Sequence, residues 1–183
     1  MDVTERPGVA RPAPLLGLAR RIAAALEAAG APAPASVGLV LSDDEELADL
    51  DLVHLGKPGP TDVLSFPLLP PEAFPAHEGG PARPPIGDDS RRPRFVEPPS
   101  RRPHLGDIVV SVERAVAQAS SGRGGQTGDV RWTPAEELGL LVTHGTLHLC
   151  GWDHADPREE AAMRDLERRL LGARPPDDPA DRS

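Results

Sequence analysis

The sequence has very little cysteine and few aromatic residues. Cys150 is the only cysteine among 183 residues, so no disulfide can form within the chain. Aromatic residues make up 3% of the chain, so the core must be built from leucine, valine, isoleucine and alanine. There is no apolar run of about 18 residues and no apolar stretch near the N-terminus. We therefore expect a soluble, cytoplasmic protein with no membrane partner.

Positive charge is also scarce. The formal net charge is −9, whereas proteins that bind nucleic acids usually present a basic surface to the phosphates. This charge does not exclude an enzyme that meets a few nucleotides at a metal ion and a local arginine patch. Proline and glycine, in contrast, number 23 and 18, which is too many for a compact α/β domain of this size unless some regions are unstructured.

Three histidines stand at positions i, i+4 and i+10 of one short stretch: His144, His148 and His154. Four residues advance about 400° around a helix, so His144 and His148 share a face one turn apart. Gly151 accepts the positive φ that ends a helix, which lets His154 turn back toward the same ion. Three neutral imidazoles with an open fourth position are typical of a catalytic zinc site, so we expect one Zn²⁺ per chain.

The same histidine spacing occurs in the metzincin proteases, H-E-x-x-H-x-x-G-x-x-H, where the glutamate is the general base. Here Gly145 stands in that position and has no side chain to accept a proton. A peptidase needs a base within hydrogen-bonding reach, so the helix argues against peptide cleavage. A metallohydrolase of another substrate, a peptide or an ester, remains an alternative that requires a base from elsewhere in the chain.

The string HGTLHLCGWDH closely resembles the signature H-G-x-L-H-L-x-G-[YW]-D-H of the YbeY family, the metal-dependent endoribonucleases of bacterial rRNA maturation. Two further blocks resemble family signatures and stand in family order, TDVLSFP at 61–67 and LGDIVVS at 105–111. The family usually has an arginine where this chain has Leu55. The resemblance covers roughly residues 36–67 and 105–171.

The resemblance implies a single-strand-specific, metal-dependent endoribonuclease that acts in rRNA maturation and ribosome quality control. It also implies that rRNA and the small ribosomal subunit are the partners, with no nucleotide cofactor. A non-catalytic ribosome-assembly factor with a structural metal remains a second alternative.

Four further residues are candidates for the same site. Asp153 either orients an imidazole beside it or lies on the surface of a turn. Asp62 and Ser65 either line the substrate cleft or, respectively, cap a turn and fill the sheet. Arg114, one turn into a helix, either contacts phosphate or is an exposed side chain without a role. With the histidines, the predicted catalytic group is thus His144, His148, His154, Asp153 and Arg114.

The order of elements predicts an α+β fold. We expect a single domain, residues 14–172, with a small mixed sheet of three or four strands and about five packed helices. The helix that follows the capping string at 42–45 is expected to turn Leu47, Leu50 and Val53 inward. The cleft should run between the histidine helix and the strand at 61–67.

Three segments are predicted to lack structure. Residues 68–104 are rich in proline and arginine and show no hydrophobic period, so we expect a disordered insert. Its arginines either contact RNA or are simply solvated. Residues 1–13 and 173–183 are expected to be flexible tails.

Overall fold

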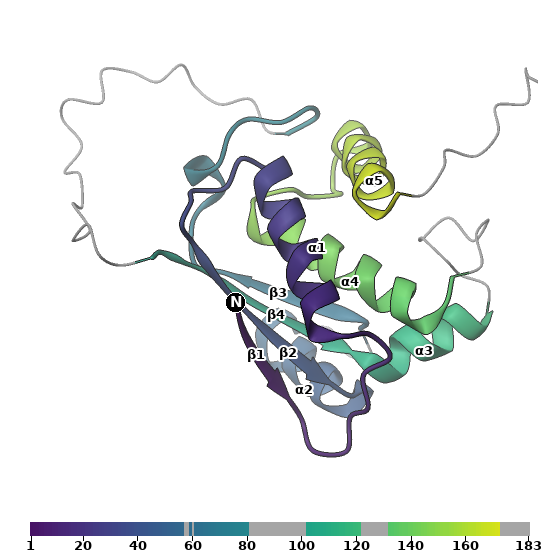
Figure 1. Ribbon diagram of the computed structural model, residues 1–183. Coiled ribbons are helices and arrows are strands. Elements are labelled where there is room, and N and C mark those ends of the chain that lie inside the picture. Colours follow the sequence, from purple (N-terminus) through teal and green to yellow (C-terminus); the bar gives the residue numbers. More distant parts are fainter. Residues whose placement is uncertain (57–58, 60, 81–101, 122–131, 173–183) are drawn as a thin grey trace, which may run out of the picture.

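The structure, a computed structural model, describes residues 1–56, 59, 61–80, 102–121 and 132–172 (Figure 1). The elements are β1 (Asp2–Glu5), α1 (Leu15–Ala28), β2 (Ser36–Ser42), α2 (Asp44–Leu55), β3 (Val63–Pro67), the 3₁₀ helix η1 (Pro71–Ala73), β4 (His104–Ser111), α3 (Val112–Ser121), α4 (Pro134–Leu149) and α5 (Pro157–Leu171). Among the described helices, none combines the length and apolar character needed to span a lipid bilayer.

The four strands form one mixed sheet in the order β1-β2-β4-β3. Strands β1 and β4 both pair in parallel with β2, and β3 pairs antiparallel with β4. The central strands β2 and β4 are mostly buried, which explains why their sequences are apolar on both faces. The described residues contain four strands and five α-helices, so the predicted α+β class is confirmed.

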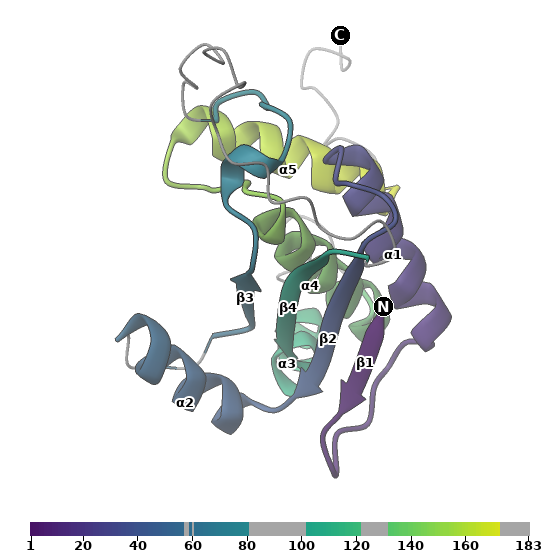
Figure 2. The same ribbon diagram turned by 90° about the vertical axis from the view of Figure 1, so that its left-hand side faces the viewer.

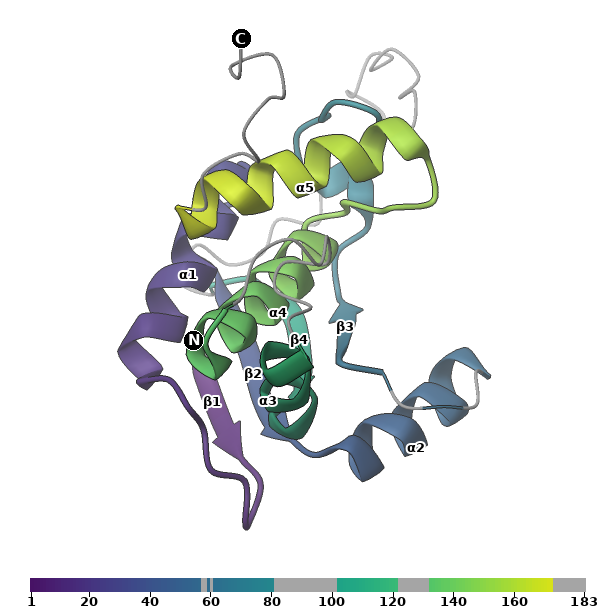
Figure 3. The same ribbon diagram turned by 90° about the vertical axis from the view of Figure 1, so that its right-hand side faces the viewer.

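Helices lie on both faces of this sheet. Ser65 donates its hydroxyl hydrogen to the Gly145 carbonyl of α4 at 3.0 Å. The next residue, Phe66, lies edge-on against His54 of α2 with ring centroids 5.1 Å apart. Because successive strand residues point to opposite faces, α4 and α2 cover opposite faces of the sheet. Figures 1 and 3 show α1 and α4 together on the first face, with α5 across the end of α4.

The buried stripe of α2 differs from the predicted one. Leu47 is fully buried as expected, but Val53 is 76% exposed, so the prediction that it faces inward is wrong. The buried residues are Leu47 and Asp51, one turn apart, and His54 continues the same face toward β3. Because Asp51 is charged, this buried face does not show as a period of apolar residues in the sequence.

Helix α4 is the central helix of the domain. Its N-terminus carries a capping box, in which Thr133 and Glu136 satisfy each other's backbone N–H groups. Its two buried threonines, Thr143 and Thr146, donate to the carbonyls four residues before them, at 2.8 and 2.7 Å. The helix can therefore be buried on almost every side without unsatisfied hydroxyls.

The N-terminal segment is not wholly a flexible tail. Residues 2–5 form β1, which pairs with Gly38–Leu41 of β2. Strand pairing uses backbone N–H and C=O groups, so a short polar segment can satisfy it. The sequence DVTE gives little apolar signal, which is why the prediction for residues 1–13 fails at the strand.

The predicted insert is structured at its start. In residues 68–80, Phe74 is 2% exposed and belongs to the core, and β4 already begins at His104. The expectation of disorder is therefore wrong for residues 68–80, because one buried ring anchors a segment without any periodic pattern. Residues 81–101, most of the insert's arginines among them, and the tail 173–183 lie outside the described residues.

Replacing Phe74 by alanine should lower the free energy of unfolding by about 3 kcal/mol, because it empties a buried ring-sized volume. Urea denaturation measures the change. Leu68→Ala is the matched control from the same segment, since Leu68 is 62% exposed and should change stability by less than about 0.5 kcal/mol. Equal effects of the two substitutions would contradict the packing described here.

Candidate metal centre

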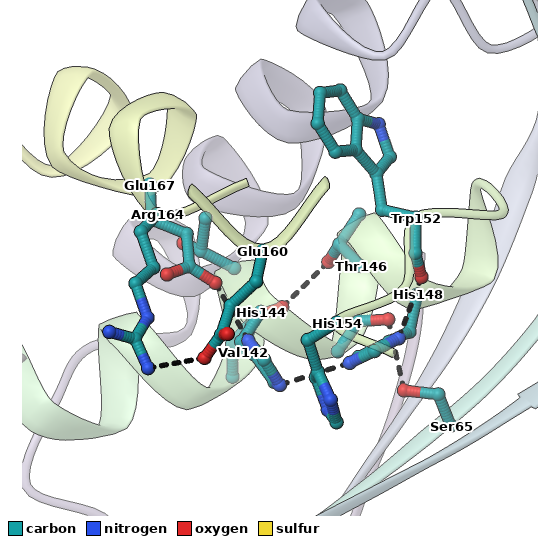
Figure 4. A network of polar contacts seen from close by, with 12 residues as sticks. Ser65, Val142, His144, Thr146, His148, Trp152, His154, Glu160, Arg164 and Glu167 are labelled. Carbon is teal, nitrogen blue, oxygen red and sulfur yellow. Dashed lines mark hydrogen bonds and ion pairs between the residues drawn. The ribbon is translucent and has the colours of Figure 1, made fainter. Parts of the chain in front are cut away.

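The three predicted histidines come together at the C-terminal end of α4 (Figure 4). Each offers one ring nitrogen, and these three atoms lie within 4.8 Å of one another. The Nε2 atoms of His144 and His148 are 3.0 Å apart. His144 is 8% exposed, His148 is partly buried and His154 is exposed. The cluster thus runs from the interior of the domain to its surface.

The loop after α4 delivers the third histidine. Gly151 has φ +82°, the left-handed conformation that ends the helix. A Cβ at Gly151 would also lie 2.9 Å from Pro71. Both the positive φ and the lack of space therefore favour glycine at this position. The chain reverses here as predicted and brings His154 back over the helix.

The two helical imidazoles are held by acceptors at their other nitrogens. Nδ1 of His144 lies 2.7 Å from Oε1 of Glu167, and Nδ1 of His148 lies 2.8 Å from the Trp152 carbonyl oxygen. A carboxylate and a carbonyl can only accept, so in each neutral ring Nδ1 carries the hydrogen. The lone pairs of both Nε2 atoms then face each other across the centre of the cluster.

This arrangement fits a divalent metal ion. Zinc–nitrogen bonds of about 2.0–2.1 Å in a tetrahedron place two nitrogens roughly 3.3 Å apart, close to the 3.0 Å seen between His144 and His148. A carboxylate behind one ligand and a carbonyl behind another are typical partners of metal-bound histidines. The donor set therefore suits the predicted ion, and its identity as zinc stays a prediction.

Burial keeps His148 neutral. The pKa of this imidazole falls from 6.5 to about 4, mainly because the ring is buried and to a smaller extent because His144 and His154 are close to it. A metal ligand must be deprotonated, so His148 is ready to bind at neutral pH. Cys150, two residues on, is 1% exposed, and burial raises the pKa of its thiol to about 12. Cys150 is thus a buried core residue whose thiol stays protonated at neutral pH.

A pocket of about 350 Å³ opens beside the histidines. Its other walls come from residues 61–65 and Pro67, at and before β3. Asp62 and Ser65 are thus both in the pocket wall, where the predicted cleft lies. Asp62 is held by Gln118, whose Nε2 donates to it at 2.9 Å. The Ser65 hydroxyl hydrogen is donated to the Gly145 carbonyl at 3.0 Å, so it is not available to a substrate.

Gly145 explains why no base stands beside the first histidine. A Cβ at this position would lie 2.7 Å from Ile108 Cγ2 and 3.1 Å from both Ser65 Oγ and Val63 Cγ2. The face of α4 next to His144 is pressed against the sheet. A glutamate in the metzincin position has no room here, because its Cβ alone would already be too close to Ile108.

Two predicted catalytic residues, Asp153 and Arg114, make contacts within the fold, and their catalytic roles stay predictions. Oδ1 of Asp153 accepts the N–H of His154 at 2.7 Å, so its carboxylate holds its own turn, and the hydrogen bonds to the helical imidazoles come from other residues. Arg114 forms a two-point ion pair with Asp44, with Nη2–Oδ2 at 2.8 Å and Nε–Oδ1 at 3.3 Å. It is not among the described residues that line the pocket.

Glu167 is a residue beside the histidine cluster that the sequence analysis misses. It is 4% exposed and lies one turn after Met163, on the apolar face of α5. A carboxylate on the inward face of an amphipathic helix is a signal for a buried partner. The side chain of Leu55, where the family usually has arginine, lies outside the described residues.

Comparisons with known proteins identify relatives of this chain. The sequence model of a family described as Endoribonuclease YbeY matches residues 13–174. A relative from Symbiobacterium thermophilum with that name is 40% identical over 157 residues, which cover 84% of this chain and 83% of the relative. One from Thermobifida fusca is 36% identical over 171 residues, covering 93% and 91%. A solution structure from Thermotoga maritima has a TM-score of 0.44 and 20% identity, and covers 86% of this chain and 81% of its own.

Replacing Glu167 by glutamine should weaken zinc binding by about tenfold, because the His144 ring loses its charged acceptor. Competition with a chromophoric chelator measures the affinity. Asp165→Asn is the matched control, since Asp165 lies on the same helix but pairs with Arg168 at the surface. If Glu167→Gln bound zinc as tightly as the control does, the contact would have no part in metal binding.

The metal-free protein should lose stability as the pH falls from 6.5 to about 4. Unfolded His148 takes up a proton near pH 6.5, whereas the folded residue resists protonation down to about pH 4. The unfolded state therefore binds more protons in this window, and acid lowers the free energy of unfolding by up to about 3 kcal/mol. Urea denaturation with a chelator present measures it, and His148→Gln should flatten the pH dependence. Parallel curves for the two proteins would refute this assignment.

Proposed function

The chain belongs to the Endoribonuclease YbeY family, and on this premise we propose that it is a single-strand-specific, metal-dependent endoribonuclease that acts in rRNA maturation and ribosome quality control. The observation that carries the proposal is the pocket of about 350 Å³ whose one side is the three-histidine cluster. The pocket is open to a substrate, and its chemistry depends on an ion held by the histidines.

Charge in the pocket explains the need for a metal. The pocket-lining residues that the structure describes include Asp62 and the three histidines but no arginine or lysine. With His148 neutral, a phosphate group meets little positive charge in this part of the wall. His144, His148 and His154 would hold a divalent ion, which we propose to be one Zn²⁺, and the bound ion would supply the positive charge for polarising a phosphoryl oxygen and activating water.

The protein's own residues hold and shape this site. Glu167 and the Trp152 carbonyl fix the ring planes of His144 and His148, so the donor atoms are already oriented. Asp62, held by Gln118, presents a carboxylate to the pocket and limits how a second phosphate can approach. Ser65 fixes the distance between β3 and α4. We assign Asp62 and Ser65 to the substrate cleft on this basis.

The two alternative functions fit the site less well. A peptidase of the metzincin kind needs a glutamate where Gly145 has no space for a Cβ. A structural zinc site is normally closed by four protein ligands, but the described residues bring together three, and one of them, His154, is exposed beside an open pocket. Hydrolysis of a substrate that reaches the ion is therefore the better account.

The proposed partners are rRNA and the small ribosomal subunit in the cytoplasm. A protein with a formal net charge of −9 gains little from general attraction to phosphates. Protein contacts on a ribosomal particle can instead position the enzyme, so that the metal centre meets only a few exposed nucleotides. This setting also agrees with a preference for single strands, whose phosphates and bases can enter a small pocket.

Replacing His148 by alanine should abolish both stoichiometric zinc binding and cleavage of single-stranded RNA, because two ligands do not hold the ion. Metal analysis and a gel assay on single-stranded and duplex RNA measure the two effects. His104→Ala is the matched control, since His104 contacts Ser36 and Asp107 outside the pocket. Full RNA cleavage by metal-free His148→Ala, or no RNA cleavage by zinc-loaded wild-type protein, would contradict the proposal.

A further inference from the structure

Residues 68–80, which we call the strap, follow β3 in the chain and run from the end of that strand to the N-terminal end of α5, which they contact through His77 and Glu159. The strap begins beside the sheet, where the Leu68 N–H donates to the Leu105 carbonyl at 2.9 Å. Phe74 then anchors it in the core with 2% exposure. Figure 2 shows the strap reaching the N-terminal end of α5, next to the loop that carries His154.

His77 is the strap residue that reaches this loop. Its Nε2 lies 2.6 Å from Oε1 of Glu159, and the exposed fractions of the two side chains are 9% and 5%. Its ring stacks on Trp152, with centroids 4.0 Å apart and planes inclined by 15°. An imidazole buried between a carboxylate and an indole has one well-defined position, so the strap and the loop are fixed to each other.

The same contacts continue to His154. Oε1 of Glu159, which His77 contacts, also accepts the N–H of Asp153 at 2.8 Å. Asp153 in turn accepts the N–H of His154 at 2.7 Å. On the other side, the Trp152 carbonyl accepts the Nδ1 hydrogen of His148 at 2.8 Å. The three residues 152–154 are thus held by their backbone groups and by the stacked indole.

His154 needs such support more than the other ligands do. His144 and His148 are placed by the backbone of α4, but His154 lies beyond the end of the helix and is exposed. A residue in an unsupported loop loses conformational entropy when it binds an ion, which weakens binding. Holding the loop in the folded protein removes that cost before the ion arrives.

We propose that His77 is a positioning residue of the metal centre, which acts through Glu159 and Trp152 to hold the loop that presents His154. It does not touch the ion or the substrate. This inference rests on the metal site of the proposed function and adds a residue outside the histidine motif. It gives the strap a role in the site as well as in the core.

Co²⁺ binding tests the inference on the full chain, because visible absorption reports both the affinity and the ligand geometry. His77→Ala removes the hydrogen bond and the stacking, and His77→Phe keeps a ring on Trp152 but loses the hydrogen bond. We expect His77→Ala to bind Co²⁺ about tenfold more weakly and with an altered spectrum, and His77→Phe to bind with an intermediate affinity. Urea denaturation gives the stability of each variant.

Ile22→Val is the matched control, since it trims a core residue of α1 that is 2% exposed and lowers stability without touching the loop. It should keep the wild-type Co²⁺ affinity and spectrum. Wild-type binding by His77→Ala, or equal weakening by Ile22→Val, would overturn the positioning role. The ratio of the Co²⁺ affinities of His77→Ala and the wild-type protein tests the role of His77 independently of RNA cleavage. If the wild-type protein bound no Co²⁺, both the metal site and the role of His77 would be overturned.

Discussion

Helix α4 approaches β3 and β4 so closely at Gly145 that a side chain has no room there, and the geometry of the metal centre depends on this contact. A Cβ would lie 2.7 Å from Ile108, and the Ser65 hydroxyl binds the Gly145 carbonyl directly. The contact sets how far His144 and His148 stand from β3, and hence the width of the pocket. A metzincin protease has its catalytic glutamate at this position. The same glycine therefore permits the close packing of α4 on the sheet and excludes a metzincin-type base.

The ligands differ in how the fold supports them. His144 is buried and backed by Glu167, His148 is partly buried and kept neutral, and His154 is exposed on a loop held from outside. Glu167 of α5 holds the ring of the innermost histidine, whereas Glu159 of α5 and His77 of the strap hold the loop of the outermost one. The interior thus provides rigidity, and the surface end provides access for a substrate.

The sequence predicts the fold class and the three histidines because both depend on local patterns. Helical spacing places His144 and His148, and turn chemistry at Gly151 returns His154. The partners that orient these rings could not be predicted in this way: Glu167 and His77 are distant in sequence, and neither belongs to a recognisable motif. For the same reason Phe74 is missed, since a single anchoring ring has no period. The ion pair of Arg114 could not be predicted either, because its partner, Asp44, comes from another element, and a catalytic role of Arg114 stays a prediction.

All three proposed metal ligands come from one continuous stretch of eleven residues, and this has a consequence for thermodynamics. An unfolded chain can close a loop of this length at small entropic cost, so denatured molecules retain some capacity to bind the ion. Binding to the unfolded state subtracts from the stabilisation that a ligand confers on the native state. The metal should therefore raise the melting temperature by less than its affinity for the folded protein implies, and a nascent chain could acquire its ion before the sheet has formed.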